Sequence, residues 1–165
     1  MAKNSRGADL RNSAVALGRL MLGFVFFWAF LDKLLGLGVN TPPAKAWLAG
    51  DSPTTGFLRG VEGPFAGFFH TLAGQAWVDW LFMLGLLGVG AALLLGVGVR
   101  LAAISGSALL LLMWAASLPL KHNPVVDDHL VYIALLAIIA TAPKKYSLAG
   151  WWQALPAVRK NRWLW

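Results

Sequence analysis

The sequence contains no cysteine. Disulfides, thiol relays, cysteine persulfides, iron–sulfur ligation by this chain and covalent c-type haem attachment all need that residue, so each of them is excluded. Charge is also scarce: 13% of the residues are charged, against about 25% in a typical soluble domain. Because 58% of the residues are hydrophobic, the composition indicates a chain embedded in a membrane rather than a soluble globular protein.

The charge that is present is mostly positive, with 14 Lys and Arg against 7 Asp and Glu. In a soluble protein this excess would point to nucleic acid. Here the basic residues stand in tails beside apolar runs, which is typical of contact with a lipid bilayer, and we expect no nucleic acid partner. The tail 1–13 is expected to be cytoplasmic and disordered. In the tail 144–165, Lys and Arg alternate with Trp, which favours contact with an anionic leaflet over a Trp-lined cofactor site.

Four apolar runs are the expected spans of one membrane domain over residues 14–143. An 18-residue run reaches about 27 Å as a helix, close to the thickness of the hydrocarbon core. The first run is longer than the apolar region of a cleaved signal peptide and lacks a small-residue cleavage site, so we interpret it as an uncleaved span. The runs cover residues 14–31, 80–99, 101–118 and 130–142.

Two run lengths carry further information. Residues 80–118 contain one charge, Arg100, and as one helix would be about 58 Å long, twice the hydrocarbon core. The glycine-rich stretch 96–100 must therefore turn the chain back. Gly88, Ala92 and Gly96 are spaced by four, as are Ala102 and Gly106, which predicts small faces for close helix contact on this hairpin. The last run is roughly 20 Å long, so we expect its helix to recruit residues 124–129.

The basic residues also predict the orientation. Nine of them lie in the two tails or at Arg100, and four lie in the other two connections. Since basic residues concentrate on the cytoplasmic side, both termini are expected to be cytoplasmic, in a prokaryotic plasma membrane. The expected fold class is an all-α integral membrane four-helix bundle with both ends inside.

The outer connection 36–77 is rich in Gly and Pro but not uniformly hydrophilic. Four apolar residues follow Pro64 at helical spacing, which predicts a short amphipathic helix in the interface or folded back onto the bundle. The segment 43–50 is a second apolar anchor. The four residues are Phe65, Phe68, Phe69 and Leu72.

This orientation gathers the polar residues of the spans at their outer ends. Charges at mid-depth cost at least ~2.5 kcal/mol, so such residues usually pair or serve a site, although polar helix ends can also simply reach water. A carboxylate, an imidazole and a phenol near one helix end suit proton transfer to a quinone-like head group. The expected catalytic residues are Asp79, Asp128, His129 and Tyr132, and the expected residues for binding quinone or a small anion are Arg19, Lys33, Asp32 and Asn123.

Two alternatives concern these residues. Arg19 lies near the inner end of the first run, where it could instead extend to the cytoplasmic head groups or pair inside the bundle. Histidines and carboxylates at 122–129 are suitable metal ligands, but their spacing matches no recognised site, so no metal is predicted. No haem is predicted either, because no histidine lies in the middle of a span.

Four motifs, taken in order, resemble the DoxX/DoxD family of small four-span membrane proteins over residues 13–148. The loop motif is similar to the family's SP..GFL.G pattern, and the last one to its N…D.H..Y segment. The motifs are Gly18-Arg19 with Gly23 and Asp32-Lys33, SPTTGFLRG at 52–60, GVGVRLAA at 96–103, and NPVVDDHLVY at 123–132.

The resemblance implies the membrane subunit of a thiosulfate:quinone oxidoreductase that works with a small DoxA-type partner subunit. With it we expect quinone as the cofactor, and an outward polar pocket that binds either the quinone or a small sulfur anion. Whether the chain is itself an enzyme stays open. The alternative is a non-catalytic accessory or scaffold subunit of a larger respiratory or redox complex. A transporter is disfavoured, because the middle of the second and third spans offers no charge.

Overall fold

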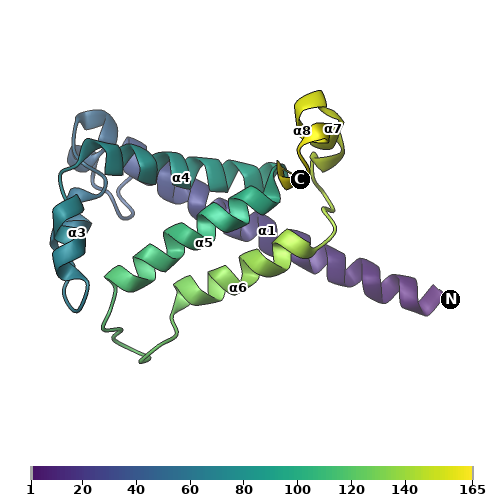
Figure 1. The fold of residues 1–165 in the computed structure, drawn as a ribbon, viewed down its shortest axis with the longest axis horizontal. Coiled ribbons are helices and arrows are strands. Elements are labelled where there is room, and N and C mark those ends of the chain that lie inside the picture. Colours follow the sequence, from purple (N-terminus) through teal and green to yellow (C-terminus); the bar gives the residue numbers. More distant parts are fainter. Residues whose placement is uncertain (1, 165) are drawn as a thin grey trace.

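The computed structural model describes residues 2–164, and every regular element in that range is a helix (Figure 1). The longest is α1 (Ala2–Leu35), which continues through most of the tail that was expected to be disordered. That expectation was wrong for the described residues. Helix propagation adds one hydrogen bond per residue once a long span has nucleated it, and no proline interrupts the tail.

Four long helices lie side by side (Figure 1). They are α1, α4 (Ala76–Leu95), α5 (Val99–Ala116) and α6 (Asp128–Thr141). Each packs against two of the others, in the cyclic order α1, α4, α5, α6. The first three are long and apolar enough to cross a membrane, which indicates a multi-pass membrane protein. The fourth has 14 residues and is about 21 Å long.

The helix α6 starts later than expected. It includes Asp128 and His129 but not residues 124–127, because Asp127 is its N-cap and has extended backbone angles. The Asp127 side chain accepts hydrogen bonds from the backbone N–H groups of His129 and Leu130, which satisfies donors that the first turn leaves free. The cap thus fixes the start of this helix.

The predicted turn between α4 and α5 is confirmed. Gly96 has φ 70° and caps α4, and Gly98 has φ 55° just before α5. Both values favour glycine, and a Cβ on Gly96 would lie 2.2 Å from the Cβ of Ser147. Of the predicted small faces, the close contact at Gly106 is confirmed, since a Cβ there would lie 3.1 Å from the Val89 side chain of α4, whereas the contact at Gly88 was wrong, since a Cβ there meets nothing within 4 Å. The close approach falls at Gly90, against the backbone of Phe27 in α1.

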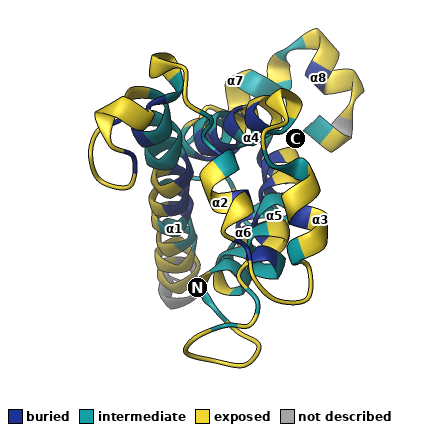
Figure 2. Cartoon of the chain, turned by 90° about the vertical axis from the view of Figure 1, so that its left-hand side faces the viewer, coloured by how far each residue is buried: buried dark blue, intermediate teal, exposed yellow. Residues whose placement is uncertain are grey.

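The main core lies between the four long helices, and Figure 2 shows the buried residues on the sides that face one another. Its most enclosed side chains come from three helices, so the bundle is held by interhelical packing rather than by one pair of helices. They are Met83 and Leu93 in α4, Val99 in α5, and Leu136 and Ile139 in α6.

The connection between α1 and α4 forms four short helices: η1 (Pro43–Lys45), η2 (Trp47–Ala49), α2 (Thr55–Arg59) and α3 (Ala66–Leu72). The predicted amphipathic helix is confirmed as α3, with Phe69 buried and Phe65 and Phe68 exposed. Phe69 joins Leu58 of α2 and Ala116 of α5 in a second small core. We call α2 and α3 with their linker, residues 55–72, the flap, because it folds back over the ends of α4 and α5.

The C-terminal segment forms α7 (Ala149–Ala154), α8 (Pro156–Lys160) and η3 (Arg162–Leu164). Figure 1 places α7 and α8 beside the turn between α4 and α5, at the end of the molecule opposite the flap. Trp151 and Trp163 are exposed there. One end of the bundle therefore carries the flap and the other carries the C-terminal helices. We call the flap end the outer end, after the orientation predicted from the basic residues.

Candidate functional site

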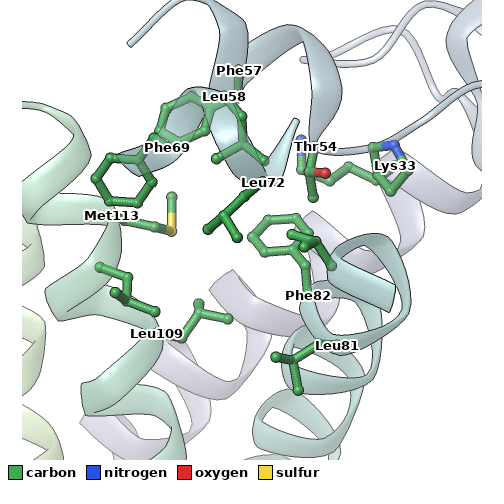
Figure 3. Close-up of a pocket in the computed structure, with 13 residues that line it drawn as sticks. Lys33, Thr54, Phe57, Leu58, Phe69, Leu72, Leu81, Phe82, Leu109 and Met113 are labelled. Atoms are coloured by element: carbon green, nitrogen blue, oxygen red, sulfur yellow. The ribbon is translucent and has the colours of Figure 1, made fainter. Parts of the chain in front are cut away.

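A cavity of about 210 Å³ lies at the outer end, between the flap and the helices α1, α4 and α5 (Figure 3). Its wall is almost entirely apolar, and Lys33 and Thr54 are its two polar members. Figure 3 shows these two on one side of the cavity, across from Phe69 and Met113. The apolar lining consists of Pro53, Phe57, Leu58, Phe69, Leu72, Val78, Leu81, Phe82, Leu109, Leu112 and Met113.

Lys33 is the single cation of this wall. Within residues 2–164 its ammonium makes no hydrogen bond and no ion pair, and its nearest defined partner is the Phe82 ring, whose centroid lies 5.8 Å away. The neighbouring carboxylate of Asp32 is 1% exposed and accepts hydrogen bonds from the backbone N–H groups of Val39 (3.2 Å) and Asn40 (3.1 Å). Asp32 therefore folds the loop after α1, and its charge also acts on the Lys33 ammonium, although the two side chains form no ion pair within 4.0 Å.

Asp79 lies in the first turn of α4, behind the cavity wall rather than in it. Its Oδ1 accepts hydrogen bonds from the hydroxyls of Ser52 (2.8 Å) and Thr54 (2.5 Å). Ser52 Oγ in turn accepts the backbone N–H of Thr55 at 3.0 Å, just where α2 begins. The buried carboxylate thus fastens the flap to α4, and Thr54 connects it to the cavity.

The other expected residues at the outer end line a separate open groove of about 960 Å³ beside the α5–α6 connection. Asn123, Asp128 and His129 belong to it, whereas Tyr132 packs against the main core and lines neither cavity. His129 Nδ1 lies 2.7 Å from Asp127 Oδ2 and 3.6 Å from Asp128 Oδ1. The structure therefore does not bring these residues into one cavity with Lys33.

The cluster at the start of α6 has ligand atoms of Asp127, Asp128 and His129 within 4.8 Å of one another, a separation that would suit a metal ion. The hydrogen bonds of Asp127 to His129 and to the first turn of α6 explain this geometry without a metal. Asp128 is exposed, as a helix-end carboxylate usually is. We therefore assign the cluster to helix capping.

Arg19 is 2% exposed, and its guanidinium lies at the C-terminal end of α4, away from the flap. Its Nη1 donates to the carbonyls of Leu93 and Leu94 at the end of α4, and its Nη2 donates to those of Lys145 (3.2 Å) and Tyr146 (2.8 Å). These carbonyls include helix C-terminal acceptors that would otherwise be unsatisfied. Arg19 thus ties the segment after α6 to α4 and is not placed beside Lys33.

Sequence reasoning missed the apolar wall. The available signals were the amphipathic pattern that became α3 and the loop motif SPTTGFLRG, which supplies Pro53, Thr54, Phe57 and Leu58. Comparisons with protein-family models, with curated proteins and with solved structures find no match to this chain. The resemblance to the DoxX/DoxD family accordingly stays a prediction.

Proposed function

We propose that this chain is a four-crossing membrane protein that binds the head group of a quinone in the Lys33 cavity, as the membrane subunit of a redox system. One observation carries the proposal: a lysine ammonium without a hydrogen-bond acceptor faces an otherwise apolar cavity at the end of a membrane-type helix. A quinone ring offers apolar faces to the wall and carbonyl oxygens to the ammonium.

The cavity favours a ring-shaped head group over a small sulfur anion. It exceeds the roughly 150 Å³ of an apolar protein cavity that holds benzene, so one substituted ring fits. A dianion such as thiosulfate would lose its hydration and gain one ammonium in return, because the Thr54 hydroxyl already donates its hydrogen to Asp79, and one ammonium does not offset the cost of burying the charge. We therefore propose quinone as the ligand of this site and leave any sulfur anion to a different surface or partner.

Reduction of a bound quinone consumes two electrons and two protons. With no cysteine for a thiol relay, we propose that a partner subunit delivers the electrons. Lys33 lines the cavity itself, and the hydrogen bond from Thr54 to Asp79 connects a carboxylate to the wall, so we propose these groups for proton exchange with the bound ring. Three other expected catalytic residues do not line the cavity, so they would have to take part in proton transfer from outside it. They are Asp128, His129 and Tyr132.

The proposed orientation places the flap outside and both termini in the cytoplasm of a prokaryotic cell. Its support is the concentration of basic residues in the tails and at Arg100. The fourth crossing is assigned to α6, which is flanked by α1 and α5. Because α6 is shorter than the hydrocarbon core, we propose that the bilayer thins locally or that polar flanking groups extend to the interface.

The binding experiment uses the purified full chain in detergent and tritiated decylubiquinone in a scintillation proximity assay. We expect saturable binding, and about tenfold weaker binding by Lys33→Met, the effect of losing one hydrogen bond to a charged donor. Lys45→Met is the matched control, since Lys45 is exposed in the connection that follows α1 and lines neither cavity. Absence of saturable binding, or equal effects of both variants, would refute the proposal.

The same preparation tests the accessory-subunit alternative. That alternative is supported by the exposed aromatic residues of the flap, Phe57, Phe65 and Phe68, which a partner could cover. Extraction in a mild detergent followed by size-exclusion chromatography should give a chain with co-extracted quinone if it binds quinone itself. A stoichiometric larger complex without quinone on this chain would favour the accessory role.

A further inference from the structure

We infer that the Lys33 cavity opens sideways into the bilayer between α4 and α5, so that its ligand is a tailed, lipid-soluble molecule whose tail leaves through this opening. The inference rests on the proposed function and adds the route and the class of ligand. It follows from which lining residues are also exposed, from their chemistry, and from their depth along the helices.

The opening is marked by lining residues that are exposed at the molecular surface. Leu81 of α4 is 65% exposed and Leu112 of α5 is 55% exposed, although both line the cavity. Phe57 of α2 is the third exposed member of the lining. All three are apolar, and a rim of this kind suits a hydrocarbon chain, whereas a route for a hydrophilic solute would be expected to carry polar groups.

Lys33 and the residues of the opening lie at depths that suit a ligand with a polar head and an apolar tail, placed in one leaflet of the bilayer. Lys33 lies two residues before the end of α1, so its ammonium is close to the outer end of the bundle. Leu81 is five residues from the start of α4 and Leu112 four residues from the end of α5, so the opening lies about 6–8 Å in from these helix ends, against about 3 Å for Lys33 in α1. A ligand would thus have its polar head at the shallow Lys33 and its tail in the hydrocarbon region.

The surface beyond the opening continues the apolar path. Leu84 on α4 and Leu111 on α5 are 57% and 50% exposed and do not line the cavity. They belong to the faces of two helices that are apolar enough to span a membrane, so lipid chains would cover them. A tail emerging past Leu81 and Leu112 therefore passes directly into lipid.

The test compares two unlabelled competitors against tritiated decylubiquinone at constant detergent: decylubiquinone, with a ten-carbon tail, and ubiquinone-0, with the same ring and no tail. For the unsubstituted chain we expect the tailed quinone to compete at least about tenfold better, since roughly two buried methylene groups account for that factor. Leu112→Trp should block the opening and remove most of this preference while ubiquinone-0 still competes.

Ile104→Trp is the matched control, because it adds the same ring to an exposed position of the same helix eight residues from Leu112 and outside the cavity lining, and it should leave the preference intact. Leu81→Trp, with Leu95→Trp at the other end of α4 as its control, repeats the test on α4 in case one variant fails to fold. Equal competition by both quinones, or equal effects within each pair, would overturn the sideways opening while leaving quinone binding in place. A chain that binds neither quinone would overturn the proposed function as well.

Discussion

At the scale of single residues, Asp127 shows how a side chain outside the spans sets where a helix begins. Burial by itself raises the pKa of Asp127. The hydrogen bonds from the His129 ring and from the backbone of His129 and Leu130, together with the charge of His129, lower it by more than burial raises it, so the pKa lies below the usual 3.8. Because the folded pKa is depressed, the ionised cap stabilises the fold at neutral pH. That contribution is lost as the pH falls through the folded pKa, below 3.8.

We predict that Asp127→Ala lowers the free energy of unfolding by about 1 kcal/mol at pH 7, the usual effect of losing an N-cap. Asp128→Ala, at the exposed neighbouring carboxylate, should have a smaller effect. Thermal unfolding in detergent, followed by circular dichroism, measures both variants. The difference between Asp127→Ala and the unsubstituted chain should shrink as the pH falls below 3.8, and a difference that grows in acid would contradict the capping role.

Arg19 is the second residue whose role the structure changes. Removing its guanidinium with Arg19→Met would leave carbonyls at the end of α4 and after α6 without a donor. We predict a loss of at least roughly 3 kcal/mol of stability, as for breaking other buried charged networks. Arg11→Met, at an exposed position of α1, is the control and should be close to neutral. Unfolding titrations in mixed micelles that rank the two variants equally would show that Arg19 does not tie these segments together.

At the scale of elements, the contact between α1 and α4 is closest at Gly90, where an added Cβ would approach α1 more closely than one on Gly23 would approach α4. A Cβ on Gly90 would lie 2.6 Å from Phe27 N and 2.9 Å from Phe27 Cα, and backbone atoms cannot move aside cheaply. We predict that Gly90→Ala destabilises the protein by about 1–3 kcal/mol through overpacking. Gly88→Ala, two residues away in open space, should be neutral or slightly stabilising because alanine favours helix. Melting temperatures of the two variants decide the matter, and similar values would argue against close packing at Gly90.

The long helices could be predicted from the sequence because their signal is local. Runs of apolar residues and the length of the hydrocarbon core fixed three spans and the turn at 96–100. The pattern from Phe65 to Leu72 was sufficient for α3. The start of α6 was misjudged because a cap formed by Asp127 competes with continuation of the helix, and hydropathy does not register a cap.

The candidate site could be predicted only in part, because its assembly depends on contacts between distant segments. Lys33 was identified from its charge at the end of a span. The bonds of Ser52 and Thr54 to Asp79 join residues more than twenty positions apart, and those of Arg19 reach across the whole chain. No periodicity encodes such pairings, so the flap and its apolar wall appear only when the helices are packed.

At the scale of the whole molecule, the proposed site requires that the flap and the α5–α6 connection lie on one side of the membrane and both termini on the other. Three apolar helices indicate a membrane protein, and the crossing by the short α6 decides where the C-terminal segment lies. The absence of native cysteine makes this arrangement directly accessible to experiment, because any single introduced cysteine is the only thiol in the chain.

The most direct measurement is labelling of single-cysteine variants with a membrane-impermeant maleimide, in spheroplasts and in inverted vesicles. Asp51→Cys and His122→Cys, at exposed positions of the outer end, should react from the periplasmic side; Arg11→Cys, Arg100→Cys at the turn between α4 and α5, and Arg159→Cys should react from the cytoplasmic side. That pattern means four crossings with the Lys33 cavity near the outer surface. Labelling of Asp51→Cys and His122→Cys from opposite sides, or of His122→Cys and Arg159→Cys from the same side, would contradict it.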